Sequence, residues 1–280
     1  MKRKDGRRIK TGDPMYAIAA HIMAERSDSM NNIKVYIPVE PMRQYMRDQK
    51  KQGHNLSHIG LVLAAFIRTV AEYPQLNRFV VNKTIYARNS IDIGMVVLQP
   101  GVEDGETMAK MHFDRTDDVF EVQRKIDEFV EHNREANADN ATEKMIRFLF
   151  SVPGLVRFGV NVFKWADKHG LLPASVIEMS PFHATMTLSN LASLRTNYIY
   201  HHVYNFGTTS MLLTMGNIEE VPRRKKDEIV FERCIPMGLV MDERICHGSY
   251  YAIAFRRFEE YLANPSLLEG EPRVVKDDVL

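Results

Sequence analysis

The stretch Met241–Phe255, MDERICHGSYYAIAF, decides how this chain is interpreted. It follows a long apolar, β-rich run, turns through a short charged segment, and enters a stretch whose apolar residues have helical spacing. Two side chains of the turn that can accept a proton, Glu243 and His247, stand four residues apart. The pattern predicts a strand, a turn and a helix. The Glu/His pair has three interpretations: a working pair, a ligand site without chemistry, or a packed turn.

The composition is that of a globular protein. Of the 280 residues, 45% are hydrophobic and 26% are charged, and a net charge of +1 gives no electrostatic reason to expect a nucleic acid partner. Two cysteines are too few for a disulfide framework, and the sequence does not open with a secretory signal pattern. The most apolar stretch, 148–172, is interrupted by proline and charged residues, which predicts no membrane span. We therefore expect a cytoplasmic protein.

Cap and turn signals divide the chain into interleaved helices and strands. Asp13-Pro14 predicts a helix that runs to about Arg26, and Ser57 caps another helix that stops at Pro74. Strands are expected at 32–40, in two short runs around Asn82-Lys83, from Ile91 onward, and at 107–113, 183–190, 209–216 and 228–242. Since no Pro-rich or Gly/Ser-rich linker interrupts this order, the sequence predicts one α/β domain, a sheet covered by helices.

We place this single domain at residues 13–265, with an apolar helical insertion at 142–176. A basic N-terminal tail (1–12) and a charged, loose C-terminal tail (266–280) flank it. The small basic clusters at the start and at 223–226 are expected to be solvated. The sequence has no Gly-rich phosphate loop, nucleophile elbow or zinc-type Cys/His spacing, so no metal is expected.

The order of several segments goes further than composition. MTLSNLASL (186–194), LLTMGNIEEVP (212–222), DERICHG (242–248) and YLANP (261–265) follow one another, after AEYPQLNRF and SIDIGMVV in the first third. This order resembles the catalytic domain of the dihydrolipoyl acyltransferases of 2-oxo acid dehydrogenase complexes, which share the chloramphenicol acetyltransferase fold. The resemblance covers about Pro14 to Pro265. It implies a two-layer α/β sandwich with a mixed sheet.

Members of that family carry Asp-His-Arg-x-x-Asp-Gly at the turn, with the histidine as general base and the second aspartate holding the site's geometry. Here Asp242, Arg244 and Gly248 match the motif. Glu243 stands at the base position and His247 at the second aspartate, as though acid and imidazole had exchanged places. Glutamate at the base position resembles a stand-alone bacterial subgroup, whereas histidine at the second position departs from it.

The exchanged pair leaves two bases open. A carboxylate is weaker than an imidazole by about two pK units unless burial changes this. Glu243 is one candidate, and the other is His247 with Glu243 orienting its imidazole. The family's second catalytic element is a hydroxyl that donates to the oxyanion. In MTLSN the matching residues are Thr187 and Ser189, and we select Ser189, with Thr187 and Asn190 shaping the site.

Other histidines and a cysteine, although their side chains could take part in catalysis, are interpreted as structural. HHVYNFG (201–207) imitates the acetyltransferase motif, but it lies between two strands and has phenylalanine at the aspartate position, so a loop or subunit contact is expected. Cys246 is expected to be a small buried thiol. His21 and His183 are expected to be satisfied core or edge histidines.

The resemblance implies a homotrimer with a channel between subunits, where the Glu243/His247 turn of one chain faces the MTLSN strand of its neighbour. Coenzyme A and a thiol or hydroxyl acceptor would enter from opposite ends. The family's lipoyl domain does not precede the catalytic segments in this sequence, so we expect a stand-alone acyltransferase without its own lipoyl group. The alternative is a catalytically impaired trimer that binds coenzyme A or another metabolite, or serves in assembly.

Overall fold

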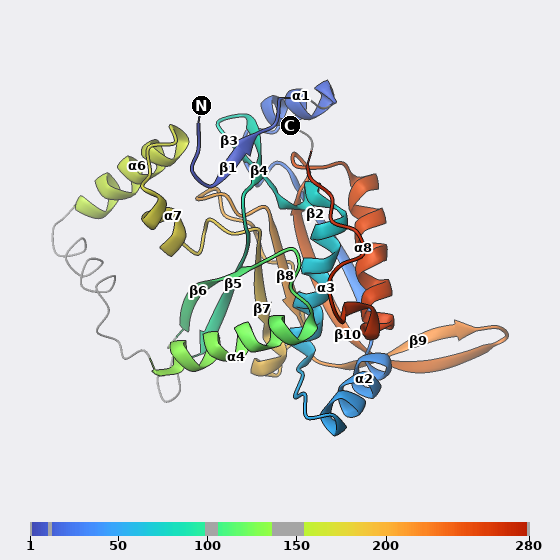
Figure 1. Ribbon diagram of the computed structural model, residues 1–280. Helices are drawn as coiled ribbons and strands as arrows, with labels where there is room; N and C mark the ends of the chain where they lie inside the picture. Colours follow the sequence, from blue (N-terminus) through green and yellow to red (C-terminus); the bar gives the residue numbers. More distant parts are fainter. Residues whose placement is uncertain (1, 11–12, 99–105, 136–153, 279–280) are drawn as a thin grey trace.

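The computed structural model describes residues 2–10, 13–98, 106–135 and 154–278. Figure 1 shows a large twisted sheet with helices packed along it. The strand order is β2-β10-β8-β7-β5-β6, with β9 paired to the outer part of β10. The pairs β5–β7 and β7–β8 are parallel and the others antiparallel, so the sheet is mixed. The strands are β2 (Met30–Pro38), β5 (Ile91–Leu98), β6 (Glu106–Phe113), β7 (Met186–Asn190), β8 (Met211–Met215), β9 (Glu219–Lys225) and β10 (Glu228–Asp242).

A second, three-stranded sheet has the order β1-β4-β3. It consists of β1 (Gly6–Arg8), β3 (Arg78–Val81) and β4 (Thr84–Arg88), all antiparallel. Asn82 and Lys83 join β3 to β4, and both have positive φ, 48° and 59°. A two-residue hairpin turn of this kind matches the twist of the strands. The sequence predicted two short strands around these same two residues.

One face of the large sheet is covered by helices, which forms the second layer of the predicted sandwich. α3 (His58–Glu72) lies at the centre of this layer, and every residue from Gly60 to Ala71 is buried. The Ser57 hydroxyl accepts a hydrogen bond from the Gly60 amide (3.0 Å), which confirms the predicted cap. α4 (Val119–Glu135) and α8 (Gly248–Ala263) pack against it, and α2 (Val39–Lys51) packs against α8 and β10.

The opposite face of the sheet is covered by the loop 195–207, which follows the short 3₁₀ helix η2 (Leu191–Leu194). Val203 packs on Leu212 of β8 and Val240 of β10. The Thr214 hydroxyl donates to the Ile199 carbonyl (2.6 Å), which ties the loop to the sheet. HHVYNFG therefore lies in a covering loop before β8, as predicted, and not before the last helix.

Both tails differ from the expectation, because buried ion pairs hold them. Arg3 is buried and pairs with Asp5 and Asp167 at 2.8 Å each. At the other end, the chain passes the 3₁₀ helix η3 (Pro265–Leu268), and Asp278 pairs with Arg78 at 2.6 Å with both side chains buried. The prediction of a loose C-terminal tail is therefore wrong.

Two other predictions need correction. α1 (Pro14–Ile22) begins at the predicted Asp13 cap but ends before Arg26, because the chain turns to bring 26–29 against the end of β10. β9 was not predicted, since its residues are charged and include Pro222. In Figure 1 the β9–β10 hairpin extends beyond the body of the molecule.

The predicted insertion 142–176 is described from residue 154 onward, and its first part lies outside the described residues. It contains α6 (Leu155–Lys168), and α7 (Ala174–Met179) follows across its boundary. Phe163 stacks on Phe206 with ring centroids 5.2 Å apart, which fixes α6 on the covering loop. No helix among the described residues is long and apolar enough to cross a membrane.

Candidate functional site

The turn that follows β10 is held by a buried ion pair. Asp242 is fully buried, and the Arg244 guanidinium donates to both of its carboxylate oxygens, Nε to Oδ1 at 2.8 Å and Nη2 to Oδ2 at 2.7 Å. Oδ1 also accepts the Ser29 hydroxyl at 2.9 Å. A bidentate ion pair of this kind fixes the orientation of both side chains in addition to its electrostatic attraction, so it sets the shape of the turn.

The backbone of the turn is fixed at the same time. The Asp242 amide donates to the Ser210 carbonyl (2.9 Å), and the Glu243 amide donates to the Ser29 carbonyl (2.8 Å). The buried Tyr251 hydroxyl donates to the Asp242 carbonyl (2.9 Å). These contacts come from Ser210 just before β8, from the α1–β2 connection and from α8, so three parts of the chain hold the Glu243 backbone in place.

The Glu243 side chain is not used in this framework. Glu243 is half-buried, and its carboxylate makes no hydrogen bond or ion pair with any residue that the structure describes. A carboxylate on a rigid backbone with unused lone pairs can accept a proton or a hydrogen bond from a bound molecule. Glu243 therefore has the properties of a group available to a ligand.

His247 has a different environment. Its ring stacks on Tyr16 of α1 with centroids 4.1 Å apart and an interplanar angle of 20°. Its Nε2 lies 3.9 Å from Asp13 Oδ2, beyond hydrogen-bond distance, and its carbonyl accepts from the amides of Tyr250 and Tyr251 at the start of α8. No hydrogen bond or ion pair joins His247 to Glu243 in the described structure, so the structure does not bring the predicted pair into contact.

Gly248 is the first residue of α8, directly after His247. Its backbone φ lies outside the left-handed region, and a Cβ built on it would meet no atom within 4 Å. We therefore find no steric reason for a glycine there within one chain.

Cys246 is buried, as predicted. Burial raises the pKa of its thiol far above the ordinary value, and the hydrogen bond with Tyr251 opposes this only in part. The thiol stays protonated and enclosed, which removes it from the candidate nucleophiles.

The predicted oxyanion donor lies on β7. Residues of a strand alternate between faces, so Thr187 and Ser189 share the face under the covering loop, while Met186 and Leu188 enter the helix-covered core. Thr187 is buried, and Ser189 and Asn190 are half-buried. The Ser189 hydroxyl makes no hydrogen bond with a described residue, so it is free to donate to a ligand.

The strand register places Ser189 and Glu243 at opposite ends of the sheet. Ser189 is level with Thr214 of β8, and Thr214 is level with Gly238 of β10. Glu243 lies five residues further along and two strands across. At about 3.3 Å per residue and about 4.8 Å per strand, the two backbones are roughly 20 Å apart. One chain does not bring the two groups to the same reacting atom.

Two other histidines, His183 and His21, were predicted to be structural. His183 is fully buried, with Nδ1 2.8 Å from the Ser180 hydroxyl and Nε2 3.4 Å from Asp167. His183 is thus a core histidine, as predicted, but it is satisfied only in part, because its buried Nε2 has no hydrogen-bond partner among the described residues. His21 is exposed on α1 and its Nδ1 lies 2.8 Å from the Ala17 carbonyl oxygen, a local contact. No group of three or more His, Cys, Asp or Glu side chains in the described parts of the chain is arranged to hold a metal ion.

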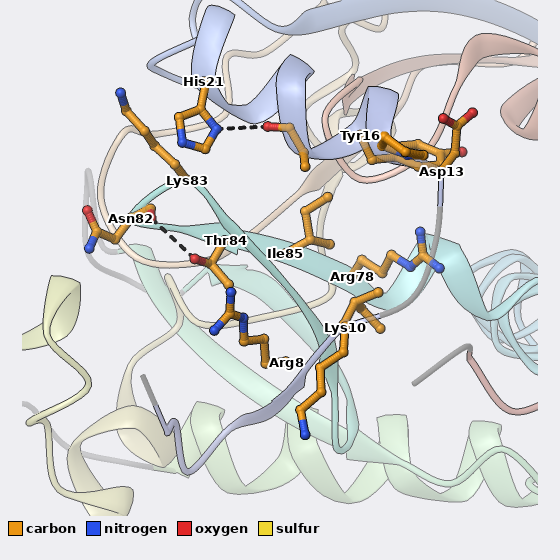
Figure 2. A pocket seen from close by; sticks show the side chains of 13 residues that line it. Arg8, Lys10, Asp13, Tyr16, His21, Arg78, Asn82, Lys83, Thr84 and Ile85 are labelled. Carbon is orange, nitrogen blue, oxygen red and sulfur yellow. Dashed lines mark hydrogen bonds between the residues drawn. The ribbon is translucent and has the colours of Figure 1, made fainter.

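A cavity of about 560 Å³ lies beside the turn, between α1, β1 and the β3–β4 hairpin. Figure 2 shows Asp13 and Tyr16 at one end of it and Lys83 and His21 at the other. Asp13 and Tyr16 also contact His247, so the cavity adjoins the turn. The sequence alone gave no signal for these contacts, because Tyr16 and His247 are 231 positions apart.

Residues 178–269, which contain β7, β8, β10 and the turn, match the family model described as the catalytic domain of 2-oxoacid dehydrogenases acyltransferase. No curated protein matches the chain.

Solved structures share the fold. A probable dihydrolipoamide acetyltransferase from Listeria monocytogenes is 15% identical with a TM-score of 0.57, and the match covers 91% of this chain and 94% of that one. A truncated catalytic core of the 2-oxoacid dehydrogenase multienzyme complex from Thermoplasma acidophilum is 14% identical with a TM-score of 0.55, covering 92% and 99%. A chloramphenicol acetyltransferase is 12% identical with a TM-score of 0.51, covering 88% and 94%. The predicted mixed-sheet, chloramphenicol acetyltransferase-like fold is confirmed.

Proposed function

We propose that this protein is an acyltransferase that moves an acyl group between coenzyme A and a thiol or hydroxyl acceptor, at a site formed by two copies of the chain. The observation that carries the proposal is the placement of Glu243 and Ser189. Each offers a polar group without a partner among the described residues, and the two lie at opposite ends of one sheet. A site that uses both requires the turn of one copy to face β7 of another.

In this proposal Glu243 is the base. Its carboxylate takes the proton of the acceptor thiol or hydroxyl, and the acceptor attacks the thioester carbonyl of acyl-CoA. The oxyanion of the tetrahedral intermediate accepts a hydrogen bond from Ser189. When the intermediate collapses, the carbon–sulfur bond to coenzyme A breaks and the proton passes from Glu243 to the departing sulfur. Asp242 and Arg244 hold the base but do not touch the reacting atoms.

The choice of Glu243 over His247 rests on their surroundings. The His247 ring is occupied by Tyr16 on one face, and its backbone begins α8. It stands where the family places a residue that maintains geometry, and its contacts suit that role. Glu243 stands at the base position with a free carboxylate. We therefore assign chemistry to Glu243 and positioning to His247.

A homotrimer is the assembly that we propose, and two exposed apolar surfaces are suited to contacts between copies. On α6, Phe158, Val162 and Trp165 follow helical spacing and are 66%, 46% and 57% exposed. On the β9–β10 hairpin, Ile229 and Phe231 are 71% and 69% exposed. Apolar surface of this extent is typical of an interface. Light scattering of the protein and of Phe158→Lys and Phe231→Lys tests whether the assembly depends on these surfaces.

Subunit complementation tests the composite site. Ser189→Ala and Glu243→Gln are each expected to lower acyl transfer from acetyl-CoA by about 10²-fold or more. When the two variants are unfolded together and reassembled, mixed trimers contain sites with the Glu243 of one copy and the Ser189 of another, so activity returns. No return of activity in verified mixed assemblies would place both residues in the same site of one chain or outside the site.

The second candidate is a protein that binds coenzyme A without catalysis. It is favoured by one observation: the free group at the base position is a carboxylate, which is a weak base toward a thiol. Calorimetric titration of coenzyme A and acetyl-CoA, together with release of coenzyme A in the presence of dihydrolipoamide, alcohols and amines, separates the two. Binding without turnover favours the second candidate. The cytoplasmic location and the stand-alone arrangement stay predictions.

A further inference from the structure

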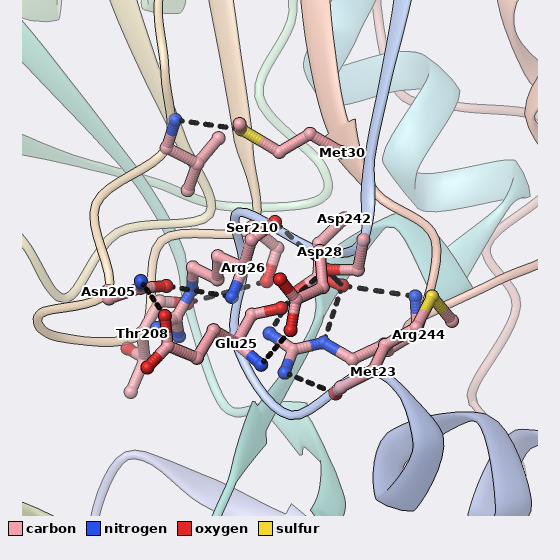
Figure 3. A network of polar contacts seen from close by, with 12 residues as sticks. Met23, Glu25, Arg26, Asp28, Met30, Asn205, Thr208, Ser210, Asp242 and Arg244 are labelled. Carbon is pink, nitrogen blue, oxygen red and sulfur yellow. Dashed lines mark hydrogen bonds and ion pairs between the residues drawn. The ribbon is translucent and has the colours of Figure 1, made fainter.

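A buried arginine near the candidate turn, Arg26, has a guanidinium nitrogen without a hydrogen-bond acceptor among the described residues. Arg26 is 6% exposed, its Nε donates to the Thr209 carbonyl (3.0 Å), and its backbone amide donates to Asn205 Oδ1 (2.7 Å). Its Nη2 is buried and makes no hydrogen bond with any described residue. Figure 3 shows Arg26 between the Asn205–Thr208 segment on one side and Asp242 with Arg244 on the other.

The nearby carboxylate does not neutralise Arg26. The Asp242 carboxylate already accepts hydrogen bonds from Nε and Nη2 of Arg244 and from the Ser29 hydroxyl. Burial lowers the pKa of the Arg26 guanidinium to about 10, and the charge of Arg244 adds to this effect while Asp242 opposes it. Two buried guanidinium groups thus share one carboxylate. A buried charge without a counter-charge is costly, and an anion that binds there removes the cost.

Both arginines line a second cavity, of about 430 Å³, which adjoins the one beside α1 and shares Asn82 and Lys83 with it. Lys83, Lys164 and Lys168 also line it, and none of the three makes an ion pair with a described residue. Its lining also holds two carboxylates, Asp167 and Glu25. Asp167 pairs with Arg3 at 2.8 Å, and Glu25 accepts the Asn205 amide at 2.9 Å. Five cationic side chains against these two carboxylates give the cavity an excess of positive charge, and Arg26 and Arg244 are both buried in its wall.

The cavity adjoins the turn that carries the candidate base, although Glu243 itself does not line it. Arg26 and Ser29 belong to one turn, since the Ser29 amide donates to the Arg26 carbonyl (3.0 Å), and Ser29 in turn accepts the Glu243 amide (2.8 Å). Arg244 is the residue after Glu243. An anionic group in the cavity is therefore close to the reacting atoms. The phosphates of coenzyme A are separated from its sulfur by the whole pantetheine arm, so they do not match this position.

We propose that the cavity of Arg26, Arg244, Lys83, Lys164 and Lys168 binds the anionic group, a carboxylate or phosphate, of the acyl acceptor. This inference rests on the proposed function for the identity of the ligand, although the anion site itself does not. It gives the acceptor a chemical class: a thiol or alcohol that carries a negative charge some bonds away from the reacting atom.

Calorimetry with malonate and inorganic phosphate tests the site without turnover. Both dianions are expected to bind the full-length protein, and Arg26→Gln is expected to raise the Kd by about tenfold or more, the size of a lost charge-assisted hydrogen bond. Because Arg26→Gln perturbs a buried group, Lys164→Gln and Lys168→Gln, on the exposed rim, give a second test with about threefold each. Lys50→Gln, exposed on α2, is the control with no change. Absence of binding, or binding that none of the variants weakens, overturns the proposal.

Acceptor preference tests the assignment to the acceptor. Thiol acids of three and six carbons are compared with their amides, and acetyl-CoA consumption is followed by chromatography. At least one acid is expected to exceed its amide by about tenfold in kcat/KM, and Lys164→Gln is expected to reduce this preference. Equal use of acid and amide overturns the assignment, as does a charge preference that appears only in the acyl donor, such as succinyl-CoA over acetyl-CoA. If no acceptor is used at all, the proposed function fails, while the calorimetry still decides the anion site.

Discussion

At the end of the sheet where β10 finishes, Asp242 and the Glu243 amide are bonded to Ser29, Ser210 and Arg244. At the other end, where β7 finishes, the Ser189 hydroxyl has no partner among the described residues. We call the first the dense end, because its hydrogen bonds hold the turn in one shape. We call the second the open end, because its hydroxyl can still donate to a ligand. The difference shows that the groups that fix the turn, Asp242, Arg244 and Ser29, are separate from the two polar side chains without partners among the described residues, Glu243 and Ser189.

The largest effect is expected from Arg244→Ala at the dense end. Removing one partner of a buried pair leaves Asp242 buried and unpaired, which costs about 3–5 kcal/mol in the free energy of unfolding. Urea denaturation measures it. The control is Arg124→Ala, whose pairs with Glu121 and Glu128 are on the surface, with an expected cost of about 0–1 kcal/mol. Similar costs for the two variants would remove the distinction between the dense turn and the surface.

At the open end, Ser189→Ala is expected to lower the acyl-transfer rate by about 10²–10³-fold while leaving the unfolding midpoint unchanged. The hydroxyl contributes to no described hydrogen bond, so its removal leaves no unsatisfied group. Ser193→Ala is the matched control, since that hydroxyl donates locally to the Asn190 carbonyl on an exposed turn. A stability loss in Ser189→Ala without a rate loss would make Ser189 a structural residue.

Within the turn, His247→Gln is expected to lower the rate by no more than about tenfold, well below the loss from Glu243→Gln. It removes the stack on Tyr16 but no group that we place at the reacting atoms. Steady-state rates of both variants, together with Tyr16→Phe, which keeps the stack, make the comparison. The reverse order of effects would identify His247 as the base.

The smallest effect concerns pH and the attachment of α6. Burial would raise the pKa of the Asp167 carboxyl, but the contact with His183 and the charge of Arg3 outweigh it, so its pKa is lowered. The stabilisation is therefore complete above pH of about 4, the ordinary carboxyl range, and is lost as the pH falls through the lower folded value.

The fluorescence of Trp165, the single tryptophan, reports on α6. We expect the emission to change below pH of about 4 in the protein and to lose this acid transition in Asp167→Asn. Asp227→Asn, in the exposed β9–β10 turn, is the control. A transition that is identical in all three proteins would show that Asp167 does not anchor α6 through its charge.

The sequence predicted the elements whose signals are local. The apolar length of β10, the Ser57 cap of α3 and the Asn82-Lys83 turn follow from patterns within a few residues, and the structure has them where expected. β9 was missed because its residues are charged, and it is stabilised by pairing along β10 rather than by a hydrophobic face. The tails were judged by charge, although Arg3 and Asp278 are buried by partners far away in the chain.

In the candidate site, too, the residues with a local motif were predicted and the long-range contacts were not. Asp242, Arg244 and Ser189 are recognised from motifs, and the structure places the first two in contact. The contacts of His247 with Tyr16 and Asp13 depend on the fold bringing α1 to the start of α8. Arg26 resembles any polar residue between a helix and a strand until its burial is known. Long-range neighbours of this kind have no sequence period that would reveal them.

The Arg78–Asp278 pair links the far C-terminal region to the candidate turn. Arg78 Nη1 also lies 3.4 Å from the Ile245 carbonyl, and its guanidinium is 5.7 Å from the Tyr16 ring that stacks on His247. A chain cut before Asp278 would leave that guanidinium buried without its carboxylate, directly beneath the turn.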